Sequence, residues 1–120
     1  MSNAVSWNLQ VAIREGHLDD FRALMEEMVA ATRQEEGMRA YEWYISDDGR
    51  ACHLYERYAD SAATMVHIGN FGANFAERFM TCVEPTAFHV YGAPSAEVRG
   101  ALDGFGAQYL GWFGGEEVRG

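Results

Sequence analysis

The chain has 120 residues, of which 48% are hydrophobic and 13% aromatic. This length and composition predict one packed domain over residues 1–120 and exclude an intrinsically disordered chain. Eighteen acidic against nine basic residues give a net charge of −9. We therefore expect neither nucleic acid nor an anionic membrane as a partner, because both need a basic surface.

The cysteines and the N-terminus indicate the cellular compartment. No secretory signal is evident at the start, and no apolar run reaches the length of a membrane span, so a cytoplasmic protein is expected. In that compartment Cys52 and Cys82 should be reduced core residues. Neither is spaced from other cysteines or histidines as a metal ligand would be, so no metal site is expected.

The first half of the chain shows three successive hydrophobic patterns. Apolar and polar residues alternate over 7–13, which predicts a strand. From His17 the apolar residues form one helical stripe, and Gly37 is a typical helix C-terminus. Residues 41–45 alternate again, and the Asp-Gly pair within 46–49 predicts a hairpin turn.

The second half repeats this order. The return strand of the hairpin is predicted over 51–58, and Asp60 is placed to cap a second helix. Gly69 and Gly72 are expected to interrupt that helix, which resumes and ends before Pro85. Residues 86–91 are rich in strand formers and predict a fourth strand.

The predicted element order is therefore β-α-β-β-α-β, the split βαβ arrangement of ferredoxin-like α+β folds. A C-terminal extension over residues 94–113 remains. Its pattern predicts a short helix to about residue 102 and a fifth strand over 108–113.

The strands also predict an assembly. Bulky side chains occupy both strand faces, as in the neighbouring pairs Trp43 and Tyr44, and Leu54 and Tyr55. Two helices cover only one face of a four-stranded sheet, so a monomer would leave the other face wet. We therefore expect a homodimer formed through the open face, with the fifth strand pairing onto the partner's sheet edge.

Several segments resemble the antibiotic biosynthesis monooxygenase (ABM) domain family. They are Gly16-His17-Leu18-Asp19-Asp20-Phe21, Glu36-Gly37 before an aromatic strand, Leu54-Tyr55-Glu56-Arg57-Tyr58, and His67. The resemblance covers a core of about residues 6–93. The extension is similar to that of a longer branch of the family, often described as quinol monooxygenases.

This resemblance implies a dimeric α+β barrel and an oxidoreductase that uses neither metal nor flavin. The implied reaction is monooxygenation of a small aromatic phenol or quinol, in which the deprotonated substrate itself reduces oxygen. Such chemistry needs a water-excluding apolar pocket, a proton acceptor near the phenolic hydroxyl and donors for the developing oxyanion. A non-catalytic barrel that binds a small hydrophobic ligand is the alternative, and a haem-degrading relative is a further one.

His67 is the candidate catalytic residue. It shares a predicted helix face with Ala63, Val66 and Asn70, and that face should point toward the sheet. An ordinary pKa near 6.5 would suit a base at neutral pH. The alternative is a histidine at the edge of the core that donates to a backbone carbonyl.

Asn70, Tyr55 and Trp43 are the candidate substrate-binding residues. Asn70 would hold a substrate oxygen, although it could instead terminate the helix. Tyr55 and Trp43 would line an aromatic pocket and supply an O–H or N–H donor, or else pack in the core or the dimer face.

Two further observations concern the charged pair and haem. Glu56 and Arg57 are adjacent on a strand and so point to opposite faces, which predicts a separate salt bridge to another strand for each.

Haem-degrading members of the family combine a first-strand Asn with a helix His and a Trp. Here Asn8 does not clearly match and that Trp is missing, which counts against haem degradation without excluding haem binding through His67.

Overall fold

A five-stranded sheet forms one layer of the molecule in a computed structural model that describes residues 2–118. The strand order is β2-β3-β1-β4-β5. The strands are β1 (Val5–Ile13), β2 (Met38–Ile45), β3 (Ala51–Tyr58), β4 (Val83–Gly92) and β5 (Gln108–Leu110). The first four pair antiparallel, whereas β5 runs parallel to β4.

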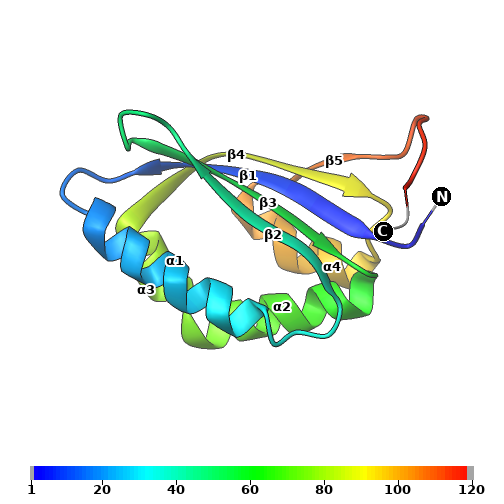
Figure 1. The fold of residues 1–120 in the computed structure, drawn as a ribbon. Helices are drawn as coiled ribbons and strands as arrows, with labels where there is room; N and C mark the ends of the chain where they lie inside the picture. Colours follow the sequence, from blue (N-terminus) through cyan, green and yellow to red (C-terminus); the bar gives the residue numbers. More distant parts are fainter. Residues whose placement is uncertain (1, 119–120) are drawn as a thin grey trace.

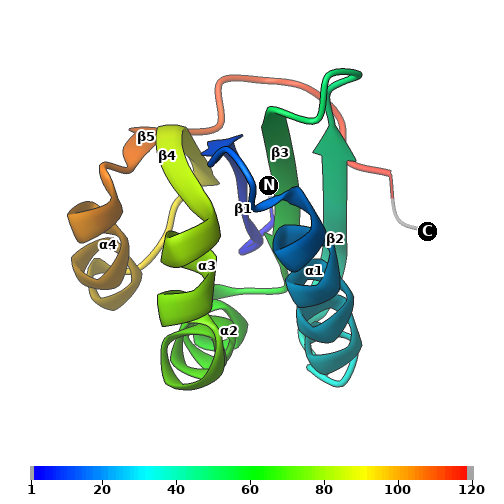
Figure 2. The ribbon, with the colours of Figure 1, turned by 90° about the vertical axis from the view of Figure 1, so that its left-hand side faces the viewer.

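The helices form the second layer, on one face of the sheet (Figures 1 and 2). They are α1 (Leu18–Thr32), α2 (Ser61–Asn74), α3 (Ala76–Cys82) and α4 (Ala96–Leu102), followed by the short 3₁₀ helix η1 (Asp103–Phe105). The predicted α+β order is confirmed, because two helical segments, α1 and the α2–α3 pair, separate the strands as the ferredoxin-like pattern requires.

Local sequence signals explain where several elements begin and turn. The β2–β3 hairpin turns at Gly49, whose φ of +71° is a conformation that favours glycine. The Asp60 carboxylate caps α2 by accepting a hydrogen bond from the Ala63 N–H at 2.8 Å. The Ser95 hydroxyl caps α4 in the same way by accepting from the Val98 N–H.

The second helix is interrupted as predicted, but the predicted position of the break at Gly69 and Gly72 is wrong. Helix α2 continues through Gly69 and Gly72 to Asn74, and the break falls at Phe75, between α2 and α3. Each interior glycine costs roughly 1 kcal/mol relative to alanine. The cap at Asp60 and the burial of Thr64 and His67 against the sheet provide the compensating interactions.

The core fills the space between the two layers in two adjoining clusters. One gathers around α1, α3 and the centre of the sheet, and it includes Phe21, Met28 and Phe79. The other gathers around α4 and the β1–β4 pair, and it includes Trp7 and Val98. The boundary between the clusters lies beneath α2, where the polar residues described below are found.

The opposite face of the sheet carries no helix of the described chain (Figure 2). Tyr44, Tyr91 and Leu110 are exposed. Within the chain β5 pairs with β4 and forms an outer edge of the sheet, and the pairing of this strand with a partner's sheet edge stays a prediction. Within residues 2–118 no helix has the length and apolar character needed to cross a membrane.

Candidate active site

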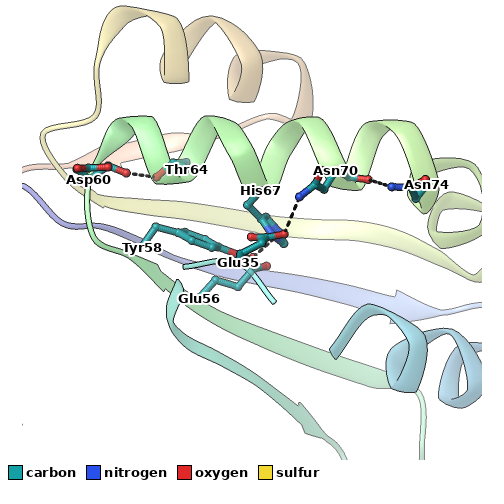
Figure 3. Close-up of polar contacts among 8 residues, drawn as sticks. All are labelled: Glu35, Glu56, Tyr58, Asp60, Thr64, His67, Asn70 and Asn74. Carbon is teal, nitrogen blue, oxygen red and sulfur yellow. Dashed lines mark hydrogen bonds and ion pairs between the residues drawn. The ribbon is translucent and has the colours of Figure 1, made fainter. Parts of the chain in front are cut away.

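Helix α2 places His67 between the two layers of the fold. The helix begins at the Asp60 cap, and two turns later the imidazole ring points toward the sheet (Figure 3). Only 6% of the residue is exposed. The ring stacks on that of Tyr58, with centroids 4.8 Å apart and planes 29° apart. His67 is therefore held by packing as well as by polar contacts.

Two buried carboxylates contact the two ring nitrogens of His67. Glu35 Oε1 lies 3.0 Å from Nδ1, and Glu56 Oε1 lies 3.1 Å from Nε2. The exposed fractions of the two glutamate side chains are 7% and 6%. Glu35 comes from the loop between α1 and β2, whereas Glu56 comes from β3. Three segments distant in sequence thus converge on one ring (Figure 3).

This arrangement changes the protonation state of His67. Burial alone lowers the pKa of the ring, but hydrogen bonds to Glu35 and Glu56 and their negative charges outweigh it and raise the pKa to about 9. The ordinary pKa expected from the sequence is therefore wrong. At neutral pH the ring is an imidazolium that donates from both nitrogens, so the carboxylates are the proton acceptors of the group.

Neighbouring side chains complete the network. The Tyr58 hydroxyl donates to Glu56 Oε1 at 2.6 Å. Burial, followed by the charge of Glu56, raises the pKa of Tyr58 well above its usual range, so this phenol stays neutral. Asn70, one turn after His67, donates through Nδ2 to Glu35 Oε2 at 3.2 Å (Figure 3). Each carboxylate is thus fixed by a second partner besides the histidine.

A cavity of about 300 Å³ opens beside His67 and Glu56, between the sheet and helices α2 and α3. Among the described residues that line it, only Trp7, Tyr41, Glu56 and His67 bring polar side-chain atoms. The apolar part of the wall consists of Leu9, Met28, Leu54, Ile68, Phe71, Gly72, Ala76, Phe79, Met80, Pro85, Phe88, Leu102 and Phe105. The cavity is therefore apolar, with one polar edge.

Tyr41 forms part of that edge. It is the register partner of Glu56 on the neighbouring strand. Its ring lies edge-on to the His67 ring, with centroids 5.5 Å apart. The Tyr41 hydroxyl oxygen is buried. It forms no hydrogen bond of ordinary geometry with the described residues, but the Thr32 and Trp43 side chains lie close enough to offset part of the rise in its pKa that burial causes. Sequence reasoning did not single out this residue for a functional role.

The three predicted substrate-binding residues are not gathered at the cavity. Asn70 contacts Glu35 rather than lining the wall, and it does not end the helix, which runs on to Asn74. Trp43 packs edge-on against Tyr41 at 5.9 Å, behind the wall. Tyr55 lies on the open face of the sheet, because its strand neighbours Leu54 and Glu56 point to the helices.

The predicted salt bridges of Glu56 and Arg57 to other strands are also wrong. Glu56 contacts the helix residue His67, and Arg57 pairs with Glu117 in the C-terminal tail. The register signal for Glu56 was present in the sequence, since it alternates with the buried Cys52, Leu54 and Tyr58. Glu35 lies in a loop, and no periodic pattern marks it.

The geometry also bears on haem and metal binding. Both nitrogens of His67 are engaged by carboxylates, so neither is free to ligate iron without breaking a buried contact. Within residues 2–118 there is no group of three or more histidine, cysteine or acidic side chains that could hold a metal ion.

Sequence comparisons identify relatives of this chain. A family model described as "Antibiotic biosynthesis monooxygenase" matches residues 5–70, which is more than half of the chain. Rv0793 of Mycobacterium tuberculosis, named as a candidate monooxygenase, is 43% identical over 49 residues. That match covers 41% of this chain and 48% of the relative, so the chain aligns with about half the length of this curated relative.

Solved structures share the fold. MupZ from Pseudomonas fluorescens has a TM-score of 0.87 at 22% identity, covering 98% of this chain and 91% of that one. The structure of Rv0793 has a TM-score of 0.60 at 32% identity, covering 77% and 95%. SnoaB from Streptomyces nogalater, described as a cofactor-independent oxygenase, has a TM-score of 0.66 at 11% identity, covering 79% and 97%. At their low identities, MupZ and SnoaB support the fold alone.

Proposed function

This chain belongs to the antibiotic biosynthesis monooxygenase family, and we propose that it is a cofactor-independent monooxygenase of a small, hydrophobic phenol or quinol. The observation that carries the proposal is the buried His67, held between Glu35 and Glu56 at the wall of an otherwise apolar cavity. The sequence relative Rv0793, which is named as a candidate monooxygenase and is 43% identical over 49 residues, supports the same reaction class.

In the proposed reaction Glu56 accepts the phenolic proton. Its contacts with Tyr58 and His67 both fall on Oε1, which leaves Oε2 for a bound molecule. The His67 imidazolium then offsets the negative charge that builds up on the substrate oxygen. Asn70 acts as a positioning residue that fixes Glu35, and Trp43 supports the Tyr41 side of the wall.

The deprotonated ring supplies the electrons for oxygen. For an anthrone-type substrate, O₂ adds to the ring carbon and the resulting hydroperoxide loses water to leave a carbonyl. A CH₂ group and O₂ are thereby converted into C=O and H₂O, so that no external reductant is consumed. The apolar wall serves this reaction by excluding water from the carbanion and the hydroperoxide.

Oxygen uptake with anthrone, followed in an oxygen electrode, tests the proposal. A general base such as Glu56 contributes about 10²- to 10⁴-fold, and a group that stabilises developing negative charge, such as His67, contributes about 10²- to 10³-fold. We therefore expect His67→Ala and Glu56→Gln to lose about 10²-fold or more of the rate. His53→Ala is the matched control, because His53 is an exposed histidine of β3 on the open face and should keep the wild-type rate. Equal rates in all four proteins would remove His67 and Glu56 from the mechanism.

The alternative is a barrel that binds a hydrophobic ligand without turning it over. Isothermal titration in the absence of oxygen separates the two functions. Tight binding of anthrone-type molecules without oxygen uptake on aeration would favour the alternative, whereas uptake with ¹⁸O from O₂ in the product would exclude it.

We further propose a homodimer that buries the open face of the sheet. The exposed Tyr44, Tyr91 and Leu110, together with the half-buried Tyr55, supply the apolar surface that supports this assembly. Light scattering at micromolar concentration should give twice the chain mass of 13.4 kDa. A monomeric mass would contradict the proposal.

A further inference from the structure

The cavity opens to solvent between the C-terminal extension and helices α2 and α3. Within residues 2–118, the exposed residues among those that line the cavity are Gly72 of α2, Met80 of α3 and Phe105 of η1, and they mark its mouth. Helix α4, which leads into η1, packs beside α2 on the same face of the sheet (Figure 2). The exposed fractions of Met80 and Phe105 are 38% and 44%. The mouth therefore lies in the helix layer, and a dimer formed through the opposite face would leave it open.

The polar edge of the cavity lies at the inner end, away from the mouth. Glu56 and His67 are both buried. His67 and Gly72 belong to the same helix and lie about 7.5 Å apart along its axis, because an α-helix rises about 1.5 Å per residue. A phenol whose hydroxyl faces Glu56 therefore extends its far ring toward the mouth. To reach that position, it has to pass Phe105 and Met80.

The turn that carries Phe105 has a fixed backbone and small neighbours. Asp103 accepts a hydrogen bond from the Tyr109 hydroxyl at 2.6 Å, and its backbone carbonyl accepts one from the Gly106 N–H at 3.1 Å. Gly104 and Gly106 flank Phe105, and a Cβ added to either would meet nothing within 4 Å. The space around the turn is therefore open, so the ring of Phe105 is the adjustable part of the mouth.

The three mouth residues differ in how they can limit an incoming molecule. None carries a charge, so the mouth favours an uncharged, apolar molecule over an ion, which would lose its hydration there. Gly72 has no side chain, and the unbranched thioether of Met80 adapts its shape to what passes. Phe105 presents a rigid ring. The width of the mouth is therefore set mainly by the position of that ring.

We infer that Phe105 is a specificity-determining residue whose ring limits the size of the aromatic molecule that reaches Glu56 and His67. This inference rests on the proposed function, which makes the cavity the substrate site, and it adds a selection by ring number. A two-ring phenol passes with the Phe105 ring in place, whereas a broader three-ring phenol has to displace it. The selecting residue lies in the C-terminal extension, outside residues 5–70 that match the family model.

Association kinetics of two phenols test the inference. 1-Naphthol has two fused rings and 9-phenanthrol has three, each carries one hydroxyl, and stopped-flow fluorescence without oxygen prevents turnover. Moving a side chain off its preferred rotamer slows a step by about 2- to 10-fold. We expect Phe105→Ala to raise the association rate constant of 9-phenanthrol by this factor and to leave that of 1-naphthol unchanged.

Two further variants serve as controls. Phe105→Tyr keeps the ring and should keep the wild-type ratio of the two rate constants. Phe113→Ala is the matched substitution at a fully exposed phenylalanine that does not line the cavity, and it should also keep that ratio. A merely structural effect of Phe105→Ala would change both rate constants alike. An unchanged ratio in Phe105→Ala, or no binding of either phenol to the wild type, would overturn the inference.

The oxygen-free design keeps this inference separable from the proposed function. If Phe105→Ala changes the ratio but the wild type takes up no oxygen with anthrone on aeration, the selection by Phe105 is retained and the monooxygenase is refuted. Oxygen uptake by the wild type, together with an unchanged ratio in Phe105→Ala, would do the reverse.

Discussion

Raising the pH should destabilise this protein through one buried histidine. The pKa of His67 is about 9 in the folded protein, against 6.5 for an ordinary histidine. A group whose pKa is higher in the folded state contributes its full stabilisation below the unfolded pKa and loses it as the pH rises through the folded pKa. Each unit of difference between the folded and unfolded pKa values corresponds to about 1.4 kcal/mol, so the contribution lost between pH 6 and pH 10 is about 3 kcal/mol.

The size of this effect would make it visible in a small domain, whose total stability is typically about 5–15 kcal/mol. Two features of the chain limit the contribution of other titrating groups to the change in stability over this pH range. All nine basic residues are arginines, so no lysine titrates in this window. Burial raises the pKa of Cys52 to about 11, and its contribution is shared by any variant at position 67.

Urea unfolding of the wild type and His67→Gln at several pH values measures the effect. The difference in unfolding free energy between the two proteins should be constant below pH 6 and shrink between pH 6.5 and 9. An NMR titration of the His67 ring protons in the wild type gives the folded pKa directly and does not depend on how stable the variant is. Parallel stability curves, or a ring that titrates at 6.5 or below, would refute the reasoning.

Two glycines give opposite predictions for stability, both measured by urea unfolding. Gly69 is an exposed residue inside α2, and a Cβ added there would meet nothing within 4 Å. Gly69→Ala should therefore raise the free energy of unfolding by about 0.5–1 kcal/mol. A lower free energy of unfolding would contradict the account of a continuous helix. A Cβ on Gly37 would clash with the Cβ of Ala63, so Gly37→Ala should destabilise by about 1–3 kcal/mol, and adding Ala63→Gly should restore most of the loss. If the second substitution restores nothing, that clash is not the cause.

The strands and the hairpin could be predicted because their signals are local. The alternation around Leu9 and the Asp-Gly pair ending at Gly49 depend only on neighbouring residues, and the structure follows them. The interruption of α2 at Gly69 and Gly72 was predicted from propensity alone. Propensity differences of about 1 kcal/mol are routinely outweighed by tertiary packing, which the sequence does not display.

The candidate site shows the same limit. His67 was predicted from helical spacing and from the family resemblance, and it is buried against the sheet; Val66 and Asn70 of the same predicted face are exposed. Glu56 could have been found from its place between buried strand residues, and the same alternation places Tyr55 on the other face. Glu35 could not, because a loop residue has no period and its contact with His67 spans 32 positions of chain. The shifted pKa of His67 depends on that contact, so it too was beyond sequence reasoning.

The C-terminal strand has a consequence for how the protein avoids aggregation. Strand β5 covers the edge of β4 at residues 89–91, and the Tyr109 hydroxyl secures it by donating to Asp103. Further along the same edge stands Pro85, which has no N–H to offer to an incoming strand. In the described sheet the outer side of β2 is then the one long edge left unpaired. Unwanted strand addition by another chain is thereby confined to β2, where the charged side chains of Arg39 and Glu42 disfavour the pairing of a second strand.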